Sequence, residues 1–576
     1  MQQLRGIGAS PGLAAAKAYR MRTGERTTPG RTTVEDAEQE VERLRKAVSQ
    51  AGTELERIRT ATEEKLGTHK AEIFEGHLMI LDDPEWMDVI VGKINDEAVN
   101  AEYAVHEISQ TFIDMLMGMD DELLRERAVD IRDVSGRVMS HLQGRPHRDL
   151  SSLTEPCILI AEDLTPSDTA QLNLDVILGF VTEIGSRTSH SAIMARSLDI
   201  PAIVGVGQGI HGIEDGAVVV MDAVEGTVLV GPGEEELVAF RDKKRSYDIR
   251  KAELAALKDR PTQSADGVRV ELAANIGKLE DVQKALDNGA EAIGLFRTEF
   301  LYMGRDSLPT EEEQFNSYKY VLEKMDGKPV VIRTLDIGGD KELPYLSLPK
   351  ESNPFLGQRA LRLCLSREDL FRTQLRALLR ASRFGNLKIM FPMIAVVDEL
   401  REAKRILEEE KRRLAEAGTP PDDRIEVGMM IEVPAAAVAA DTFAGEVDFF
   451  SIGTNDLIQY TMAADRMNET VAYLYQPCHP AVLRLIRMVI QAAKQQGKWV
   501  GMCGEMAGDQ TAIPLLLGMG LHEFSMSAGS ILPARELIGR LSKAEWSMSA
   551  EEALTMRGQD EIQAFIRMKI RNGAYA

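Results

Sequence analysis

The second half of the chain alternates short apolar runs with longer amphipathic stretches. Eight such runs follow Gly267, and they occupy residues 270–275, 292–297, 330–334, 388–392, 427–432, 449–453, 500–503 and 523–526. Short apolar runs between segments of helical periodicity predict buried parallel strands, each joined to the next by a helix. Eight βα units within about 310 residues have the count and length of a (β/α)8 barrel. We therefore predict that fold for residues 261–576.

Residues 33–147 carry a different pattern. Glycine is scarce there, charged residues are dense, and apolar side chains such as Val41, Leu44, Val48 and Leu55 recur at helical intervals. This spacing places the apolar residues on one face of each helix, where they can pack against neighbouring helices. The region is predicted to be an all-helical insert of several antiparallel helices.

The segments on either side of this insert return to short apolar runs that glycine interrupts. The runs cover residues 157–161, 176–181, 202–207 and 217–221, and residues 1–25 add a strand-like opening. Residues 1–25 and 148–232 are together predicted to form one α/β domain, with the opening strand completing its sheet. Residues 233–260 contain no glycine after Gly233, so we expect a long connecting helix that ends before Pro261.

Length and charge narrow the class of protein. At 576 residues the chain is too long for a single core, and two to four domains are expected. Its 68 basic and 91 acidic residues leave a net charge of −23, which argues against a nucleic-acid partner and favours a small basic protein. No apolar run is long enough to span a membrane, and the first residues lack the apolar core of a signal peptide. We expect a cytoplasmic protein without membrane insertion.

The four cysteines, Cys157, Cys364, Cys478 and Cys503, are widely spaced and form no C-x-x-C pair. This spacing argues against a disulfide framework or a structural zinc site and fits a reducing compartment. Cys503 stands at the end of a predicted barrel strand, whereas we interpret the other three as small buried apolar residues. A free thiol has a pKa of about 8.5, so Cys503 would be protonated at neutral pH and could donate a proton. A buried structural cysteine would have the same appearance in the sequence.

One histidine lies where a predicted strand gives way to a helix. The segment Gly185–Arg196 follows the run 176–181, and apolar residues at helical spacing follow His190. Thr188 and Ser189 are typical N-cap residues, so His190 is expected in the first helical turn. The free N–H groups and positive dipole there leave a neutral, nucleophilic imidazole and would stabilise a phosphoryl group on the ring. An ordinary histidine at a helix start would show the same pattern.

Polar side chains gather where the predicted barrel strands end. In a (β/α)8 barrel these carboxyl ends form the active site. The residues at or just after the strand ends are Asn275, Arg297, Glu299, Arg333, Asp336, Glu432, Asn455, Asp456, Cys503 and Glu505, with Arg359 and Arg466 in nearby loops or helix starts. Several arginines around one mouth suit a small anion with phosphate and carboxylate groups, because guanidinium binds each of them in a bidentate manner.

Two carboxylates among these residues suit a metal ion. Glu432 and Asp456 belong to neighbouring predicted strands, and Mg²⁺ prefers a few carboxylates completed by water and substrate oxygens. Asn455, which precedes Asp456, could reach a bound phosphate. The barrel is therefore predicted to bind Mg²⁺ together with an anionic substrate.

An acidic cluster follows an apolar run within the helical region. The cluster consists of Asp82, Asp83, Glu85 and Asp88, and the run is residues 73–79. Acidic groups around an apolar patch suit a small protein with a basic rim and steer its approach, although a solvated helix face would look alike. We interpret His77 as a packing or interface histidine and not as a second phosphoryl carrier, because no phosphate-cradling loop surrounds it.

With these residues in view, the chain resembles the Enzyme I family, the phosphoenolpyruvate–protein phosphotransferases of bacterial sugar phosphotransferase systems. The motifs that carry the resemblance are Gly185–Arg196, Gly294–Leu301, Asp336–Lys341, Asp448–Asp456 and Gly501–Glu505. Long motifs in this order are highly specific, and the resemblance extends over essentially the whole chain. It implies a swivelling phosphohistidine α/β domain with an all-helical insert, followed by a barrel that binds phosphoenolpyruvate.

The resemblance also implies a role for each residue. His190 would carry the phosphoryl group, and phosphoenolpyruvate would be bound by Arg297, Arg333, Arg359, Asn455, Asp456 and Arg466. Glu432 and Asp456 would bind Mg²⁺, and Cys503 would protonate the enolate carbon to yield pyruvate. The helical insert would bind the carrier protein HPr, whose histidine accepts the phosphoryl group. The barrel would carry the homodimer interface.

Two positions depart from the usual pattern of this family. Ser186 replaces the second glycine of Gly-Gly-Arg-Thr-Ser-His, and Val433 stands where a threonine usually follows the metal-binding glutamate. If the glycine allows a close backbone approach, serine would slow transfer slightly, whereas a glycine that only forms a turn is replaced without effect. Neither departure removes a chemical group that the mechanism needs.

Two other functions use similar parts. Pyruvate phosphate dikinase and phosphoenolpyruvate synthase share the histidine segment and the barrel, but they need a large ATP-binding region, and the stretch before His190 is too short for one. A nitrogen-type regulatory phosphotransferase usually adds an N-terminal sensory domain, whereas this sequence begins with the first strand of the histidine domain. We therefore expect the sugar-type transferase.

Overall fold

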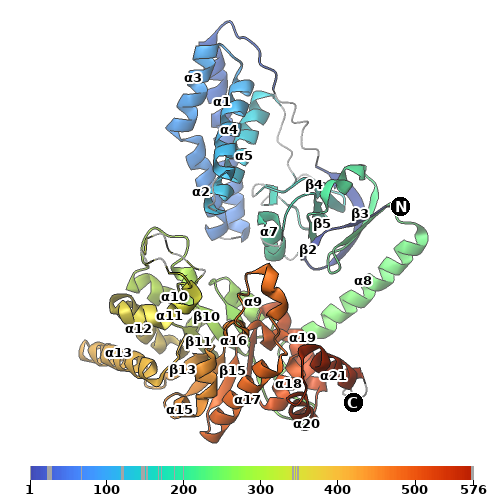
Figure 1. The fold of residues 1–576 in the computed structure, drawn as a ribbon. Coiled ribbons are helices and arrows are strands. Elements are labelled where there is room, and N and C mark those ends of the chain that lie inside the picture. Colours follow the sequence, from blue (N-terminus) through green and yellow to red (C-terminus); the bar gives the residue numbers. More distant parts are fainter. Residues whose placement is uncertain are drawn as a thin grey trace. The chain divides into compact units, whose positions relative to one another are not determined.

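The chain divides into two compact units, residues 1–249 and residues 250–576. The computed structural model describes residues 2–21, 29–66, 68–118, 122–144, 150, 153–165, 168–169, 172–186, 189–198, 200–339, 341, 343, 345–346, 349 and 351–571. One unit contains an open sheet and the other a closed barrel (Figure 1). Within the described ranges, no helix is long and apolar enough to cross a membrane.

The first unit is built on one mixed sheet. Its strands are β1 (Gln2–Arg5), β2 (Ile7–Ser10), β3 (Leu13–Arg20), β4 (Cys157–Ala161), β5 (Ile177–Thr182), β6 (Ala202–Val204), β7 (Val218–Asp222) and β8 (Thr227–Val230). Their order in the sheet is β1-β8-β7-β3-β4-β5-β6-β2. Strands β3 to β6 run parallel, and the other strands pair antiparallel at either side. The predicted α/β sheet, with the N-terminal segment completing it, is confirmed.

Each face of this sheet buries its own core. Successive residues of a strand point to opposite faces, so Leu159 of β4 belongs to one apolar cluster and Ile158 to the other. Helix α7 (His190–Leu198) packs into the first cluster through Ala192 and Ala195. Apolar contacts thus fix the helix that starts with the predicted phosphohistidine against the sheet.

Between β3 and β4 the chain forms a bundle of helices. They are α1 (Ala37–Leu66), α2 (Thr68–Leu81), α3 (Pro84–Glu97), α4 (Ala101–Met117) and α5 (Glu122–Leu142). Leu44 and Leu55 of α1 are fully buried in the core that these helices share. At the start of α3, the Asp83 side chain accepts a hydrogen bond from the Glu85 N–H, and Pro84 occupies the first turn. The predicted all-helical insert is confirmed.

Helix α8 (Glu234–Ala255) connects the two units, and the boundary between them falls within it. It begins with Glu234, Glu235 and Glu236, whose charges favour the positive end of the helix dipole. It ends before Pro261, as the sequence predicts.

The second unit is a closed barrel of eight parallel strands. They are β9 (Glu271–Ile276), β10 (Ala292–Arg297), β11 (Pro329–Arg333), β12 (Asn386–Phe391), β13 (Glu426–Ile431), β14 (Phe449–Ile452), β15 (Trp499–Met502) and β16 (Glu523–Met526). Each strand pairs with the next, and β16 closes the barrel by pairing with β9. All eight predicted strands are confirmed, with ends within about two residues of those expected from the sequence.

Helices surround these strands. They are α9 (Asp281–Asp287), α10 (Glu311–Lys324), α11 (Ala360–Ser366), α12 (Glu368–Ala381), α13 (Val397–Glu416), α14 (Pro434–Val438), α15 (Ala440–Ala444), α16 (Thr454–Met462), α17 (Pro480–Gln495), α18 (Ile513–Met519), α19 (Ile531–Arg540), α20 (Lys543–Ala553) and α21 (Gln559–Arg571). Outward-facing strand residues such as Leu272, Ile332 and Phe450 pack with them in one large core. This core holds the barrel in shape around its mouth.

The interior of the barrel is a second, smaller core. Its buried members are Leu295, Val331, Met390, Met430, Phe449 and Cys503. Because every second residue of a barrel strand faces inward, the residues two positions further along β11 and β13 are the inward-facing Arg333 and Glu432. The apolar interior therefore ends in a polar mouth at the carboxyl ends of the strands.

Candidate active site

The histidine segment begins helix α7 as predicted. His190 is the first residue of the helix, and Ser189 precedes it. The Ser189 hydroxyl donates to the Ser186 carbonyl at 2.9 Å, and the Ser191 hydroxyl donates to Asp163 Oδ1 at 3.3 Å. The position of His190 in the first helical turn is confirmed, whereas its side chain and the residues Arg187 and Thr188 lie outside the described part of the chain.

The surroundings of this helix start bear on the departure at position 186. Gly185 has a φ of +124°, a conformation that favours glycine, but Ser186 is not among the residues with positive φ. Ser186 is exposed, and its carbonyl accepts the hydrogen bond that orients Ser189. A serine is therefore accommodated at position 186 without backbone strain.

The barrel mouth brings the other predicted residues together. Arg297 and Arg333 end strands β10 and β11, Glu432 and Cys503 follow β13 and β15, Arg359 precedes α11, Asn455 and Asp456 lie in the first turn of α16, and Arg466 follows that helix. Glu432, Cys503, Arg359, Arg333 and Asp456 are all buried, with exposed fractions between 1% and 7%. Buried ionised groups need close partners of opposite charge.

Asp336 supplies that partner for two arginines. Arg333 Nη1 lies 2.9 Å from Asp336 Oδ2, and Arg359 Nη2 lies 3.0 Å from Asp336 Oδ1. Burial disfavours the ionised carboxyl, but the charges of Arg333 and Arg359 outweigh burial and hold the pKa of Asp336 below its ordinary range. Asp336 therefore stays ionised and orients two guanidinium groups at the mouth.

Glu299 joins a further cation to the group. Arg333 Nη2 and Lys341 Nζ both donate to Glu299 Oε1 at 2.7 Å. Glu299 is 1% exposed, and although burial opposes its ionisation, Arg333 and Lys341 lower its pKa. Lys341 was not among the predicted ligands, and its place in the Asp336–Lys341 motif was the signal that could have identified it.

Asp456 links the other two arginines. Its Oδ1 lies 3.4 Å from Arg359 Nη1 and 3.7 Å from Arg466 Nη1. Arg359 Nη1 also donates to the Tyr460 hydroxyl at 3.1 Å, a contact that the sequence did not suggest. Arg359 thus spans the mouth from Asp336 to Asp456 and belongs to the site, not to its rim.

Glu432 and Asp456 fit the predicted metal. Glu432 Oε1 accepts a hydrogen bond from the Met393 N–H at 2.7 Å, which orients the carboxyl group. Burial and the negative charges of Asp456 and Asp336 raise the pKa of Glu432 to about 8. Two buried carboxylates that disfavour each other's ionisation gain from a cation between them, and Mg²⁺ completes its shell with water and substrate oxygens. Within the described residues no cluster of three or more metal-ligating side chains exists, so substrate oxygens would have to contribute.

Cys503 lies in the apolar interior directly below the charged groups. Its sulfur is 3.9 Å from the Ile452 carbonyl oxygen, and the thiol is 3% exposed. Burial raises the pKa of the thiol to about 11, although a hydrogen bond with Ser451 and the charge of Arg333 act in the opposite direction. The thiol is therefore protonated at neutral pH and suited to donate a proton.

Two predicted ligands occupy the rim of the mouth. Asn455 Oδ1 accepts a hydrogen bond from the Glu505 N–H at 3.1 Å and lies 3.4 Å from the Tyr475 hydroxyl. These contacts leave its NH₂ group available to a ligand. Arg297 has no hydrogen-bond or ion-pair partner among the described residues, and its guanidinium is half-buried. Val433 packs against the barrel core, so the second departure from the family pattern is accommodated.

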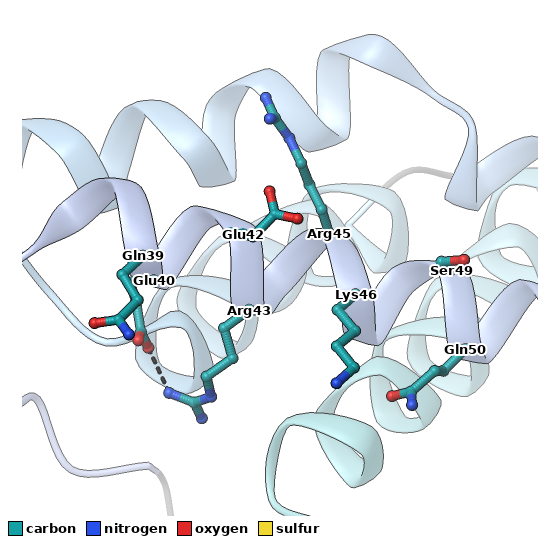
Figure 2. Close-up of a pocket in the computed structure, with 8 residues that line it drawn as sticks. All are labelled: Gln39, Glu40, Glu42, Arg43, Arg45, Lys46, Ser49 and Gln50. Carbon is teal, nitrogen blue, oxygen red and sulfur yellow. Dashed lines mark hydrogen bonds and ion pairs between the residues drawn. The ribbon is translucent and has the colours of Figure 1, made fainter.

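A separate cavity of about 790 Å³ lies along helix α1. It is lined by Gln39, Glu40, Glu42, Arg43, Arg45, Lys46, Ser49 and Gln50 (Figure 2). Figure 2 shows Arg43 against Glu40, with Nη1 and Oε1 2.7 Å apart, and Arg45 directed away from this pair. None of the candidate catalytic residues lies there, so the chemistry of the protein is expected at the barrel mouth and at α7.

Sequence comparison identifies similar proteins over the whole length. Profiles of the PEP-utilising enzymes match the chain: the N-terminal region over residues 5–127, the mobile domain over 153–226 and the PEP-binding domain over 251–543. The phosphoenolpyruvate-protein phosphotransferase of Bacillus subtilis (strain 168) is 58% identical over 567 residues, covering 98% of this chain and 99% of the relative. That of Geobacillus stearothermophilus is 60% identical over 564 residues, covering 98% and 97%.

Proposed function

Because this chain belongs to the phosphoenolpyruvate-protein phosphotransferases, a family of PEP-utilising transferases, we propose that it moves the phosphoryl group of phosphoenolpyruvate (PEP) to its own His190. From His190 the group passes to a histidine of the carrier protein HPr, and pyruvate is released. The sugar-type transferase is favoured over a dikinase, since the matched regions run from residue 5 to residue 543 and include no ATP-binding domain.

The charge network at the barrel mouth is the observation that carries this proposal. Arg333, Arg359 and Arg466 are linked through buried carboxylates, and Arg297 stands beside them without a partner in the described part of the chain. A ligand with a phosphate and a carboxylate supplies the anions that such guanidinium groups bind. PEP has both groups on three carbon atoms.

Within this site the protein positions charge and supplies a proton. The guanidinium groups and Asn455 hold PEP and stabilise the negative charge that develops on the phosphoryl group and the enolate. Glu432 and Asp456 would hold Mg²⁺, which when bound neutralises further charge. The thiol of Cys503 protonates the enolate carbon and so yields pyruvate. The N–H groups at the start of α7 stabilise the phosphoryl group on His190.

The helical insert offers a surface for HPr. Asp82, Asp83 and Glu85 are exposed between α2 and α3, close in sequence to Met79 and Val89, which are 71% and 46% exposed. An apolar patch with an acidic rim attracts a small protein with a basic rim. His77 supports packing and not phosphoryl transfer, because it is fully buried and its Nε2 lies 3.1 Å from Asp130 Oδ1.

We further propose a homodimer through the barrel unit and a place in the cytoplasm. Leu356, Met467 and Tyr473 lie on loops that follow barrel strands, and they are 64%, 66% and 72% exposed. Large apolar side chains in such positions favour association with a second surface. All four cysteines are free and buried, which fits a reducing compartment.

Labelling with PEP tests the proposed function. Incubation with PEP labelled in its phosphoryl group and Mg²⁺ is expected to give acid-labile label on His190, which HPr then removes. His190→Gln is the control and should take no label. Absence of label from the unmodified protein would contradict the proposal, labelling by ATP without PEP would favour a dikinase, and faster transfer to a nitrogen-type carrier would favour a regulatory role.

A further inference from the structure

Proton donation by Cys503, which rests on the function proposed above, leaves a thiolate that must regain a proton before the next turnover. The residue is 3% exposed. The arginines above it are poor proton sources, because a guanidinium group does not deprotonate in proteins. Glu432 is engaged as a proposed metal ligand. The barrel interior below Cys503 contains another source.

Polar residues line one side of that interior. The inward-facing positions of β10 to β13 carry the apolar side chains of the interior core. Strands β14, β15 and β16 instead place Ser451, Gly501 and Glu523 at one level, since Ser451 pairs in register with Gly501, and Gly501 with Glu523. Glu271 of β9 continues the row as the register partner of Glu523. The row crosses the seam where the barrel closes.

Glu523 is a buried acid without a hydrogen-bond partner. It is 2% exposed, and within the described residues neither of its carboxyl oxygens is hydrogen-bonded. Burial and the charge of Glu271 raise the pKa of Glu523 well above its ordinary value, so it holds a proton at neutral pH. Lys388 acts in the opposite direction, but its Nζ is engaged 2.6 Å from Glu426 Oε2.

Ser451 connects this acid with the thiol. Its side chain is 1% exposed, and its hydroxyl has no nitrogen or oxygen partner in the described part of the chain. Its hydrogen bonding with Cys503 lowers the pKa of the thiol. Between Ser451 and Glu523 stands Gly501, and a Cβ atom on that glycine would lie 2.7 Å from Glu523 Oε1. The carboxyl group therefore lies over the glycine, and no side chain separates it from Ser451.

We propose that Glu523 restores the proton of Cys503 through Ser451 and a buried water molecule that both side chains bind. Buried polar groups are hydrogen-bonded in folded proteins, and a buried water needs two to four polar partners. The Ser451 hydroxyl and the carboxyl group of Glu523 provide such partners at one level of the barrel.

The step moves protons only. The O–H bond of Glu523 breaks as the water takes its proton, and the water passes a proton to the Ser451 oxygen. The Ser451 proton then forms the S–H bond of Cys503. Glu523 is reprotonated by Glu271, which is half-buried at the start of β9 and exchanges with solvent at the amino-terminal end of the barrel. One solvent proton is consumed in each turnover, and no electrons are transferred.

Rapid-quench kinetics with excess PEP and HPr test the relay. The first turnover uses the proton already on the thiol, so Glu523→Gln is expected to form the first pyruvate at the unmodified rate. Later turnovers should slow at least about tenfold, because they depend on reprotonation. Ser451→Ala should show the same burst. The control is Glu426→Gln, which removes a carboxylate from the same end of the barrel outside the row and should show no burst.

Each outcome decides the proposal. A steady rate equal to the first-turnover rate in both variants would overturn it, and so would a parallel loss of both phases, which indicates a distorted barrel. If the unmodified protein failed to phosphorylate His190, the proposed function would fail instead. Infrared spectroscopy gives a readout without turnover: the carboxylic-acid C=O band at neutral pH should disappear in Glu523→Gln and shift in Ser451→Ala. Its absence from the unmodified protein would exclude a protonated Glu523.

Discussion

Asn275 at the end of β9 donates a hydrogen bond to the backbone carbonyl of Cys503 at the end of β15, with 2.9 Å between Nδ2 and the oxygen. The same side chain accepts a hydrogen bond from the Ser525 hydroxyl of β16 at 2.7 Å. Asn275 therefore joins three consecutive strands where the barrel closes. It fixes the segment that carries the proposed proton donor.

Asn275→Ala should weaken both the barrel and its chemistry. Loss of these hydrogen bonds leaves polar partners unsatisfied, and we expect a free energy of unfolding lower by about 1–3 kcal/mol. The rate of pyruvate formation should fall more than the affinity for PEP, because the thiol loses its support. Calorimetry and steady-state kinetics measure the two effects. Gln283→Ala removes an exposed amide on α9 and serves as control; equal effects of the two variants would contradict the role of Asn275.

Asp336→Asn should weaken PEP binding. The amide cannot neutralise Arg333 and Arg359, so their guanidinium groups lose the partner that orients them. We expect the KM for PEP to rise at least about tenfold, and the barrel to lose about 3–5 kcal/mol of stability. Asp369→Asn breaks an exposed ion pair with Arg367 and should leave both quantities nearly unchanged. A KM within twofold of the unmodified value would exclude the orienting role.

Cys503 should react slowly with iodoacetamide. Its pKa of about 11 lies above that of a free thiol, so the reactive thiolate is scarce at pH 8. Ionisation alone predicts a rate at least about 100-fold below that of a free cysteine peptide, rising until the pH passes the pKa. Mass spectrometry of the labelled peptide distinguishes Cys503 from the other cysteines. A plateau of the rate below pH 9 would contradict the raised pKa.

Asp82→Lys should slow the association with HPr. Reversing a charge at the proposed docking surface opposes the approach of a basic partner, so we expect the association rate to fall about tenfold at low salt. The difference should shrink as salt screens the charges. Asp398→Lys makes the same change on the exposed surface of α13 and serves as control. Stopped-flow measurements that give equal rates for both variants would place the HPr surface elsewhere.

Much of the barrel and its mouth could be predicted from the sequence. Strands buried on both sides appear as continuous apolar runs, and the run 449–453 differs from β14 only in its last residue. Since active sites of such barrels lie at the carboxyl ends of strands, Arg333 and Cys503 could be located from the pattern alone. Lys341 and Tyr460 were missed because they lie in loops and helices whose direction the apolar pattern does not determine.

The sequence by itself determined which segments become strands and helices and which chemical groups stand at their ends, because burial and helical periodicity are local properties of the chain. Only the tertiary structure decided which groups meet. Arg359 reaches Asp456, 97 positions away, and Asn275 reaches Cys503 across 228 positions. These contacts, the raised pKa of Cys503 and the row from Ser451 to Glu523 arise from closure of the barrel. Closure sets strand register and burial, which no local pattern contains.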